Sequence, residues 1–211
     1  MNTKRWVLLF LLIAAVGMVP QAVGAAAPNV YTSVIVSDVK EGAPVIGGTF
    51  KTDVSLSIEN NATPKTGIMG VDLWLAFDPA IVQVDDADNN PANGVQVEVS
   101  TGFFGSSLVV AENIVETCPG GSGSCVHLAL SKTGSPIYDR TGKIATITWA
   151  GIAEGAAGLD IVEPDTVLAD VDGNDVPINS STVPAITVME PGFIKGVVER
   201  QGTRTDHADT Y

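Results

Sequence analysis

The sequence predicts an all-β protein, folded as an antiparallel β-sandwich or jelly roll. Two observations carry this prediction. Apolar and polar residues alternate with period two over much of residues 30–188, and turn-forming residues interrupt the alternation about every ten positions. Such alternation places one side of each strand in a core and the other towards solvent. Many short strands at even spacing, with little helical periodicity, are typical of these two architectures.

Four segments show the alternation most clearly, and their apolar positions are the expected core. These inward residues are Val54, Leu56, Ile58, Val71, Leu73, Leu75, Phe77, Val95, Val97, Val99, Val126, Leu128 and Leu130. Segments 107–117 and 126–131 flank a stretch rich in glycine and serine. We therefore expect these two segments to be the arms of a β-hairpin.

The first 26 residues are interpreted as a secretory signal peptide. A basic start at residues 1–5 is followed by an apolar run over residues 6–19 and by small residues at 22–27. This order is typical of a cleaved leader. The apolar run has fourteen residues, whereas a membrane-spanning helix needs about 20. We expect an exported protein, secreted or at the cell surface, with no membrane span after cleavage.

Composition excludes two further classes of protein. The chain has 24 Asp and Glu against 11 Lys and Arg, a net charge of −13, and loss of Lys4 and Arg5 with the leader makes it −15. A polyanion repels phosphate backbones, so we expect no nucleic-acid partner. A hydrophobic content of 45% with only 17% charged residues excludes wholesale disorder.

Cys118 and Cys125 bracket the tip of the predicted hairpin. Two such cysteines in an exported protein are expected to form a disulfide bond. A metal site would need further ligands nearby in the sequence, and a redox catalyst would need a Cys-x-x-Cys motif at the start of a helix. We interpret the pair as a structural disulfide.

No catalytic residue is assigned. Neither His127 nor His207 lies in a motif that would build a serine or cysteine triad, so the protein is not expected to be an enzyme. The acidic segments 85–90 and 170–175 carry oxygen ligands at alternate positions but match no complete calcium loop. We interpret both as solvated turns and assign no cofactor or metal ligand; calcium stays open as the alternative.

Three segments together resemble cohesin domains. They are Gly-Ile-Met-Gly-Val-Asp-Leu-Trp-Leu-Ala-Phe-Asp-Pro at 67–79, Gly-Lys-Ile-Ala-Thr-Ile-Thr-Trp at 142–149 and Ala-Asp-Val-Asp-Gly-Asn-Asp-Val-Pro-Ile at 169–178. They occur in the order found in the family. The resemblance implies a jelly-roll sandwich of about nine strands over residues 29–190. It also implies a non-catalytic receptor for dockerin modules in a polysaccharide-degrading or cell-surface assembly.

Two alternative functions are kept beside dockerin binding. The superfamily of cohesins includes carbohydrate-binding modules, so a polysaccharide is the alternative ligand. A structural or adhesion domain without a discrete ligand is the third possibility. Sugar binding commonly uses exposed aromatic faces, and the candidates for such a platform are Trp74 and the pair Phe103 and Phe104. Only ten aromatic residues follow the leader, which favours protein binding.

The resemblance also implies a binding face. In cohesins the sheet that contains the strand matching residues 67–79 receives the dockerin. Strand phase directs Asp72, Trp74 and Ala76 away from the core, and Asp72 matches a contacting Asp of the family. The strand at 126–132 is expected to lie in the same sheet and to add Ala129 and Lys132.

The C-terminal residues 191–211 differ from the rest of the chain. Residues 193–202 resemble the first strand of a small β module of the carboxypeptidase-regulatory type. The nineteen residues 193–211 cannot bury a core of their own. We therefore expect either a linker or tail, or the start of a second module that is truncated here.

Overall fold

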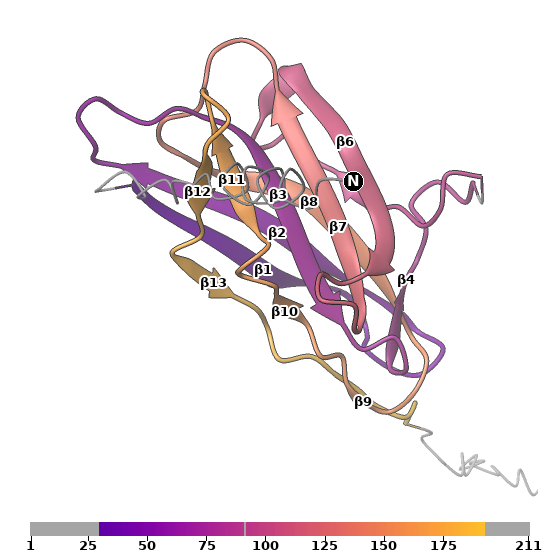
Figure 1. The fold of residues 1–211 in the computed structure, drawn as a ribbon. Coiled ribbons are helices and arrows are strands. Elements are labelled where there is room, and N and C mark those ends of the chain that lie inside the picture. The colour runs from indigo at the N-terminus through magenta and orange to yellow at the C-terminus, as the bar shows by residue number, and fades with distance from the viewer. Residues whose placement is uncertain (1–29, 91, 193–211) are drawn as a thin grey trace, which may run out of the picture.

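The fold is a sandwich of two β-sheets (Figure 1). A computed structural model describes residues 30–90 and 92–192. Within these residues the chain forms two six-stranded sheets, a two-stranded sheet and one 3₁₀ turn, η1 (Gly105–Ser107). The predicted leader and the tail from residue 193 lie outside the described residues.

The first large sheet, called the β1 sheet, has the order β13-β1-β2-β8-β4, with β5 also paired to β8. Its strands are β1 (Val30–Gly42), β2 (Thr49–Asn60), β4 (Val82–Val84), β5 (Glu98–Val99), β8 (Arg140–Gly151) and β13 (Ser180–Thr182).

The second large sheet, called the β3 sheet, has the order β12-β11-β3-β7-β6, with β10 also paired to β3. Its strands are β3 (Ile68–Phe77), β6 (Leu108–Thr117), β7 (Ser124–Lys132), β10 (Asp160–Ile161), β11 (Val167–Asp170) and β12 (Asp175–Pro177). The small sheet pairs β9 (Gly155–Ala156) with β14 (Thr187–Val188).

The predicted all-β sandwich is confirmed, with two differences. The described residues contain fourteen strands instead of about nine, and seven of these have only two or three residues. The pairing is antiparallel except between β13 and β1, which run parallel. The physical reason is that β13 follows β12 of the opposite sheet. It therefore reaches β1 by a crossover, whereas a tight hairpin would impose antiparallel pairing.

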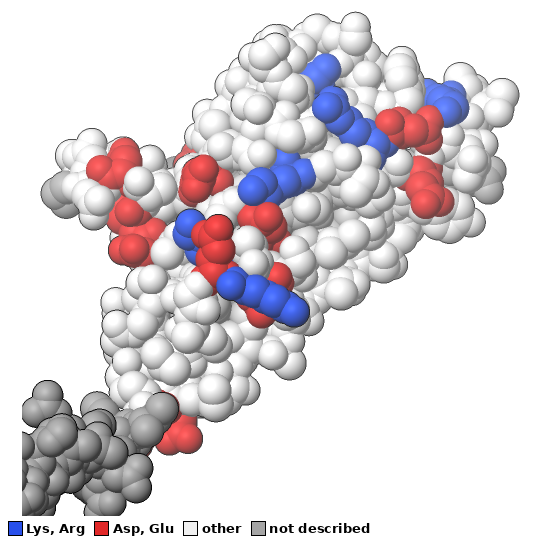
Figure 2. Space-filling view, turned by 180° about the vertical axis from the view of Figure 1, so that it is seen from behind, with Lys and Arg blue, Asp and Glu red and all other residues white. Residues whose placement is uncertain are grey.

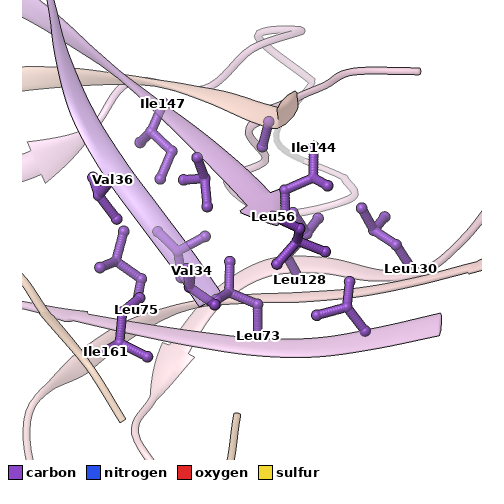
Figure 3. Packing of buried hydrophobic residues seen from close by; sticks show 14 of the residues in the cluster. Val34, Val36, Leu56, Leu73, Leu75, Leu128, Leu130, Ile144, Ile147 and Ile161 are labelled. Carbon is purple, nitrogen blue, oxygen red and sulfur yellow. The ribbon is translucent and has the colours of Figure 1, made fainter. Parts of the chain in front are cut away.

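The core lies between the two sheets. Figure 3 shows Leu73 and Leu128 of the β3 sheet near Val34 and Leu56 of the β1 sheet, and all four are almost fully buried. Burying one such side chain contributes about 1.5–3 kcal/mol. Trp149 is also buried, and its indole N–H donates a hydrogen bond of 2.9 Å to the Thr52 hydroxyl.

The predicted strand phase is confirmed in three of the four segments, 54–58, 71–77 and 126–130. Segment 95–99 differs, because only Glu98–Val99 pair as a strand and Val95 is exposed. A side chain replaces the missing strand partner. The Val97 N–H donates to Asn113 Oδ1, and Asn113 Nδ2 donates to the Val97 carbonyl, both at 2.9 Å.

Gly42 shows why the turn between β1 and β2 requires glycine. Its φ of +84° lies in the left-handed region, and a Cβ atom built on it would lie 1.9 Å from the Thr49 carbonyl oxygen. The register of β1 against β2 shifts between Asp38 and Gly42. Any side chain at position 42 would therefore force the two strands apart.

The predicted hairpin and disulfide are both present. Strands β6 and β7 pair antiparallel from Leu108 opposite Lys132 to Thr117 opposite Ser124. A disulfide joins Cys118 and Cys125, seven positions apart, and closes the tip of this hairpin. The bond links the edge strand β6 to β7 at the end where the two strands turn.

We predict that reducing the disulfide lowers the free energy of unfolding by about 2–3 kcal/mol, the chain-entropy value for so short a loop. Urea unfolding with and without reductant measures the change. The variant Cys118→Ser/Cys125→Ser is the control, because its unfolding should be the same with and without reductant and should match that of the reduced protein. Equal midpoints for oxidised and reduced wild type would contradict the prediction.

Candidate functional site

The side of the β3 sheet that faces away from the core is the candidate site, and we call it the outer β3 face. Strand alternation turns one residue in two towards it, because the intervening residues of β3 and β7 fill the core. The residues that define it are Asp72, Trp74, Ala76, Glu112, Ile114, Glu116, His127 and Ala129.

The strand register arranges these residues in rows across β3, β7 and β6. The central row is Trp74, His127 and Ile114, directly opposite one another on the three strands. One flanking row reads Asp72, Ala129 and Glu112. In the other, Ala76 and Glu116 lie on either side of Cys125, which is fully buried and is not counted among the residues of the face. An aromatic and aliphatic centre is thus flanked by carboxylates.

His127 lies at the middle of this face and contacts carboxylates on both sides. Its Nδ1 is 2.7 Å from Glu116 Oε1, and its Nε2 is 2.9 Å from Asp72 Oδ1. The imidazole also stacks on the Trp74 ring, with the ring centroids 3.7 Å apart and the planes 12° apart. We call Asp72, Trp74, Glu116 and His127 the His127 cluster.

Exposure differs within the cluster. The side chain of His127 is only 12% exposed, whereas those of Asp72 and Glu116 are 46% and 39% exposed. The imidazole therefore lies beneath two carboxylates that remain accessible from solvent. Each carboxylate is diagonal to His127 across a strand pair, a distance that long side chains bridge.

The predicted contact residues Asp72, Trp74, Ala76 and Ala129 all lie on the outer β3 face. Lys132 does not, which corrects its expected orientation. It is an even number of residues from Leu128 and Leu130, so it shares their phase and not that of Ala129. Its ammonium group donates instead to the Ser135 carbonyl oxygen.

Phe103 and Phe104 do not form the predicted aromatic platform. Both side chains are buried, and they contact each other edge to face with their centroids 4.9 Å apart. One face of Trp74 is covered by His127. The platform expected for sugar stacking is therefore absent at the Phe pair and reduced at Trp74.

Sequence reasoning missed Glu116 and the role of His127. The polar phase of His127 in its strand was visible, but its two carboxylate partners come from different strands. Asp72 is 55 positions away and Glu116 is 11 positions away. Only the strand register, which no local motif specifies, brings the three together.

The two outer faces of the sandwich carry different charges. Among the described residues, neither Lys nor Arg occupies an outward position on the outer β3 face or next to it. This holds for β3, β6, β7, β10 and β11. Figure 2 views the molecule from the other side and shows Lys and Arg spread over it. Lys51 and Lys143 lie there, 2.8 Å from Glu41 and 3.3 Å from Asp53 respectively.

An open cleft of about 440 Å³ lies at the edge of the β1 sheet. Its lining includes Tyr31, Ser33, Ser57, Glu59 and Asn179. The Tyr31 side chain is among the most exposed large hydrophobic groups of the described residues, at 58%. Hydroxyl, carboxylate and amide groups thus surround an accessible aromatic ring.

Comparison with solved structures reveals the fold. A type II cohesin domain from the cellulosome of Acetivibrio cellulolyticus is 14% identical, with a TM-score of 0.52, over 75% of this chain and 95% of the other. Type II cohesin A11 from Bacteroides cellulosolvens is 15% identical, with a TM-score of 0.51, over 75% and 99%. The chain has a cohesin-like fold.

A third similar structure comes from a type II cohesin–X-dockerin complex of Acetivibrio cellulolyticus. It is 15% identical, with a TM-score of 0.51, over 74% of this chain and 99% of that chain. No protein-family model matches the sequence, and no curated protein is similar to it. The resemblance inferred from the three sequence segments is thus confirmed at the level of the fold.

No helix among residues 30–90 and 92–192 of the cohesin-like chain is both long enough and apolar enough to cross a membrane. In the same residues, no group of three or more His, Cys, Asp and Glu side chains is arranged to hold a metal ion. The carboxylates of the two acidic segments instead accept hydrogen bonds from their own turns. A side-chain hydrogen bond from Asn93 and a backbone one from Asn90 lower the pKa of Asp88.

Asp170 closes the turn between β11 and β12 in the same way. Its Oδ1 accepts hydrogen bonds from the N–H groups of Asp172, at 2.9 Å, and Asn174, at 2.8 Å. Burial acts to raise the pKa of this carboxyl, but the hydrogen bonds from Asn174, Asp172 and Gly173 outweigh it and lower the pKa. The ionised form of Asp170 therefore stabilises the turn.

We predict that Asp170→Asn destabilises the protein at neutral pH and not in strong acid. A carboxyl whose pKa is lower in the folded state contributes stability above its unfolded-state pKa, about 3.9 for Asp. That contribution is lost as the pH falls through the folded-state value. Thermal unfolding of both proteins from about pH 7 to about pH 2.5 should show their Tm difference shrinking. A difference independent of pH would contradict this assignment.

Proposed function

We propose that the protein is an exported, non-catalytic cohesin-like module that binds a dockerin-bearing partner through its outer β3 face. The observation that carries this proposal is the arrangement of that face on a cohesin-like fold. Trp74, His127 and Ile114 form its centre, and Asp72, Glu112 and Glu116 flank them. The solved structure of a cohesin–X-dockerin complex with a similar fold supports a dockerin as the class of partner.

The composition of the face suits a protein partner. Binding energy in interfaces concentrates in a few residues, among which Trp is enriched. The polar rim of an interface adds specificity and orientation. Since the rim here carries carboxylates and the named outward positions carry no Lys or Arg, a complementary partner presents basic groups around an apolar centre.

The geometry at His127 supports a non-catalytic role. A catalytic histidine needs one nitrogen free to accept a proton from a nucleophile and the other held by an orienting group. In this protein both nitrogens face carboxylate oxygens, at 2.7 and 2.9 Å. The imidazole therefore has no nitrogen available to activate a hydroxyl or thiol group.

Export is proposed from the N-terminal leader, and the disulfide supports it. Disulfides persist in oxidising compartments and are rare in reducing ones. The bond between Cys118 and Cys125 fits a protein that functions outside the cytoplasm. Its place in a polysaccharide-degrading or cell-surface assembly is proposed from the resemblance to cohesins.

We predict that Asp72→Ala and Trp74→Ala each weaken dockerin binding by at least about 1–2 kcal/mol, since each removes a side chain from the proposed contact surface. Stability should change little, because both side chains are partly exposed. Calorimetric titration against a panel of type I and type II dockerins, including the Acetivibrio cellulolyticus X-dockerin, measures the affinity.

The control for these variants is Glu98→Ala, which removes an exposed carboxylate from the β1 sheet. Its affinity should equal that of wild type. If a dockerin binds wild type and both outer-face variants equally well, the outer β3 face is not the docking surface. If no dockerin in the panel binds, dockerin recognition itself is contradicted.

A second candidate function is polysaccharide binding, and the cleft at Tyr31 is the observation that favours it. Sugars are bound by aromatic rings that cover their apolar faces, with hydrogen-bonding groups around the edge. The cleft offers the exposed Tyr31 ring beside the Glu59 carboxylate and the hydroxyl groups of Ser33 and Ser57. It opens on the β1 sheet, away from the outer β3 face.

For this candidate we predict that insoluble polysaccharide in an affinity gel retards the wild-type protein and that Tyr31→Ala abolishes the retardation. Tyr138→Ala is the matched control, because Tyr138 is 43% exposed and does not line the cleft. Equal retardation of wild type and Tyr31→Ala would exclude the cleft. A protein that binds neither dockerins nor polysaccharides would favour the third possibility, a structural or adhesion domain.

A further inference from the structure

We infer that His127 is a positioning residue of the outer β3 face, and that it organises this face for partner binding only while its imidazole carries two protons. The inference rests on the proposed docking function, and it names the group that regulates the docking site. The imidazole of His127 contacts three neighbours, Asp72, Glu116 and Trp74.

Both nitrogen contacts can be hydrogen bonds to ionised carboxylates at the same time only when the ring carries two protons. A neutral imidazole has one N–H donor and one lone pair, whereas the imidazolium ion has two donors. Both contact atoms are carboxylate oxygens, and an ionised carboxylate can accept hydrogen bonds but cannot donate them. With a neutral ring, one nitrogen lone pair would face a carboxylate oxygen at 2.7 or 2.9 Å. That repulsion would release either Asp72 or Glu116 from the cluster.

The charged groups around the ring are all acidic. Asp72 approaches it from β3 and Glu116 from β6, and Glu112 of β6 lies in the row of Asp72, on the other side of the central row from Glu116. Asp160 of β10 lies opposite Ala76, beyond the row that contains Trp74. His127 is the only side chain that β7 places on this face with an ionisable group. Among the described residues of this face, His127 in its protonated form is therefore the one cation that these carboxylates can contact.

Covering the face by a partner makes this cation important. A partner seated on Trp74 removes water from Asp72 and Glu116, and any carboxylate oxygen that the partner's basic groups do not reach then needs a donor from this protein, because desolvation without a donor is strongly unfavourable. A protonated His127 supplies one donor to each carboxylate from below. It also holds their side chains in place, which reduces the entropy lost on binding. Loss of the imidazolium charge would make the face more negative and so more attractive to a basic partner. This attraction is weak at an exposed surface and is outweighed by the loss of the donor.

The sign of the pH effect follows from this comparison. If the partner prefers the doubly protonated ring, binding takes up protons and weakens as the pH rises. Histidine is the side chain that changes charge between about pH 5 and pH 8, while Asp and Glu stay ionised in this window. We expect the affinity for dockerin to fall at least about fivefold from pH 5.5 to pH 8, the lower end of typical coupling between linked equilibria.

The first experiment follows the protonation of His127 by tryptophan fluorescence, without any partner. Protonated imidazole quenches the fluorescence of an indole in contact with it, and His127 stacks on Trp74. The other tryptophan of the sandwich, Trp149, is buried and hydrogen-bonded to Thr52. Emission from the mature protein should rise between pH 5.5 and pH 8 and should stay level in His127→Gln. An equal rise in both proteins would overturn the inference.

The second experiment measures dockerin affinity by calorimetry at the two pH values, with His127→Gln as the comparison. Glutamine has a single amide donor group and no proton to lose in this range. The variant should therefore bind at both pH values as weakly as wild type does at pH 8. The dockerin's own titration is the same in both series and cancels from their difference.

The outcomes separate the inference from the proposed function. Equal pH dependence of wild type and His127→Gln with a binding dockerin would overturn the inference and leave dockerin docking intact. In particular, if His127→Gln is weaker than wild type by the same factor at pH 5.5 and at pH 8, His127 has a purely structural role and the inference is overturned. If no dockerin binds, the proposed function fails together with this regulation of it, while the emission experiment still decides whether His127 loses a proton in contact with Trp74 over this pH range.

Discussion

The antiparallel register between β3 and β7 is the constraint on which the rest of the structure depends. Residues from Gly70 to Phe77 pair in order with residues from Ser131 back to Ser124. This register places Leu73 opposite Leu128 in the core, and Trp74 opposite His127 on the outer face. Because side chains alternate with period two, a slip of one residue would move leucines into solvent and the tryptophan into the core. The core therefore sets the geometry of the candidate site, because packing holds the strands that carry the His127 cluster in register.

The two faces of the sandwich are suited to different contacts. The outer β3 face combines aromatic and aliphatic groups with carboxylates, and its acids are joined through one histidine. On the opposite side, Lys and Arg alternate with acids and are partly neutralised by ion pairs (Figure 2). Exposed ion pairs of this kind contribute little stability, but they leave that face without a strong field of one sign. The concentration of one sign of charge around Trp74 is what distinguishes the proposed docking face.

Where the strands end, polar side chains form the hydrogen bonds to the backbone that a neighbouring strand would otherwise supply. Asn113 provides the hydrogen bonds that a neighbouring strand would have given Val97, and Asp170 holds the turn between β11 and β12. Both satisfy backbone groups that would otherwise lack partners at the edge of the sandwich. The acidic segment around Asp170 therefore has a structural use for its carboxylate in addition to contributing negative charge. Its residues are the ordinary components of Asx turns.

The sequence by itself determined the all-β class, the inward phase of three of the four strongest segments, the hairpin and its disulfide, because these depend on local alternation and on cysteines close in the chain. Strand phase, counted from residue to residue, also determined that Asp72 and Trp74 share a face and that Ala129 points away from the core, whereas the resemblance to cohesins implied that their strands lie in one sheet. Only the tertiary structure decided the parallel pairing of β13 with β1 and the burial of Phe103 and Phe104. It alone assembled Asp72, His127 and Glu116, because that contact depends on the register of three strands. Register is selected by the packing of the whole core, which no single segment encodes.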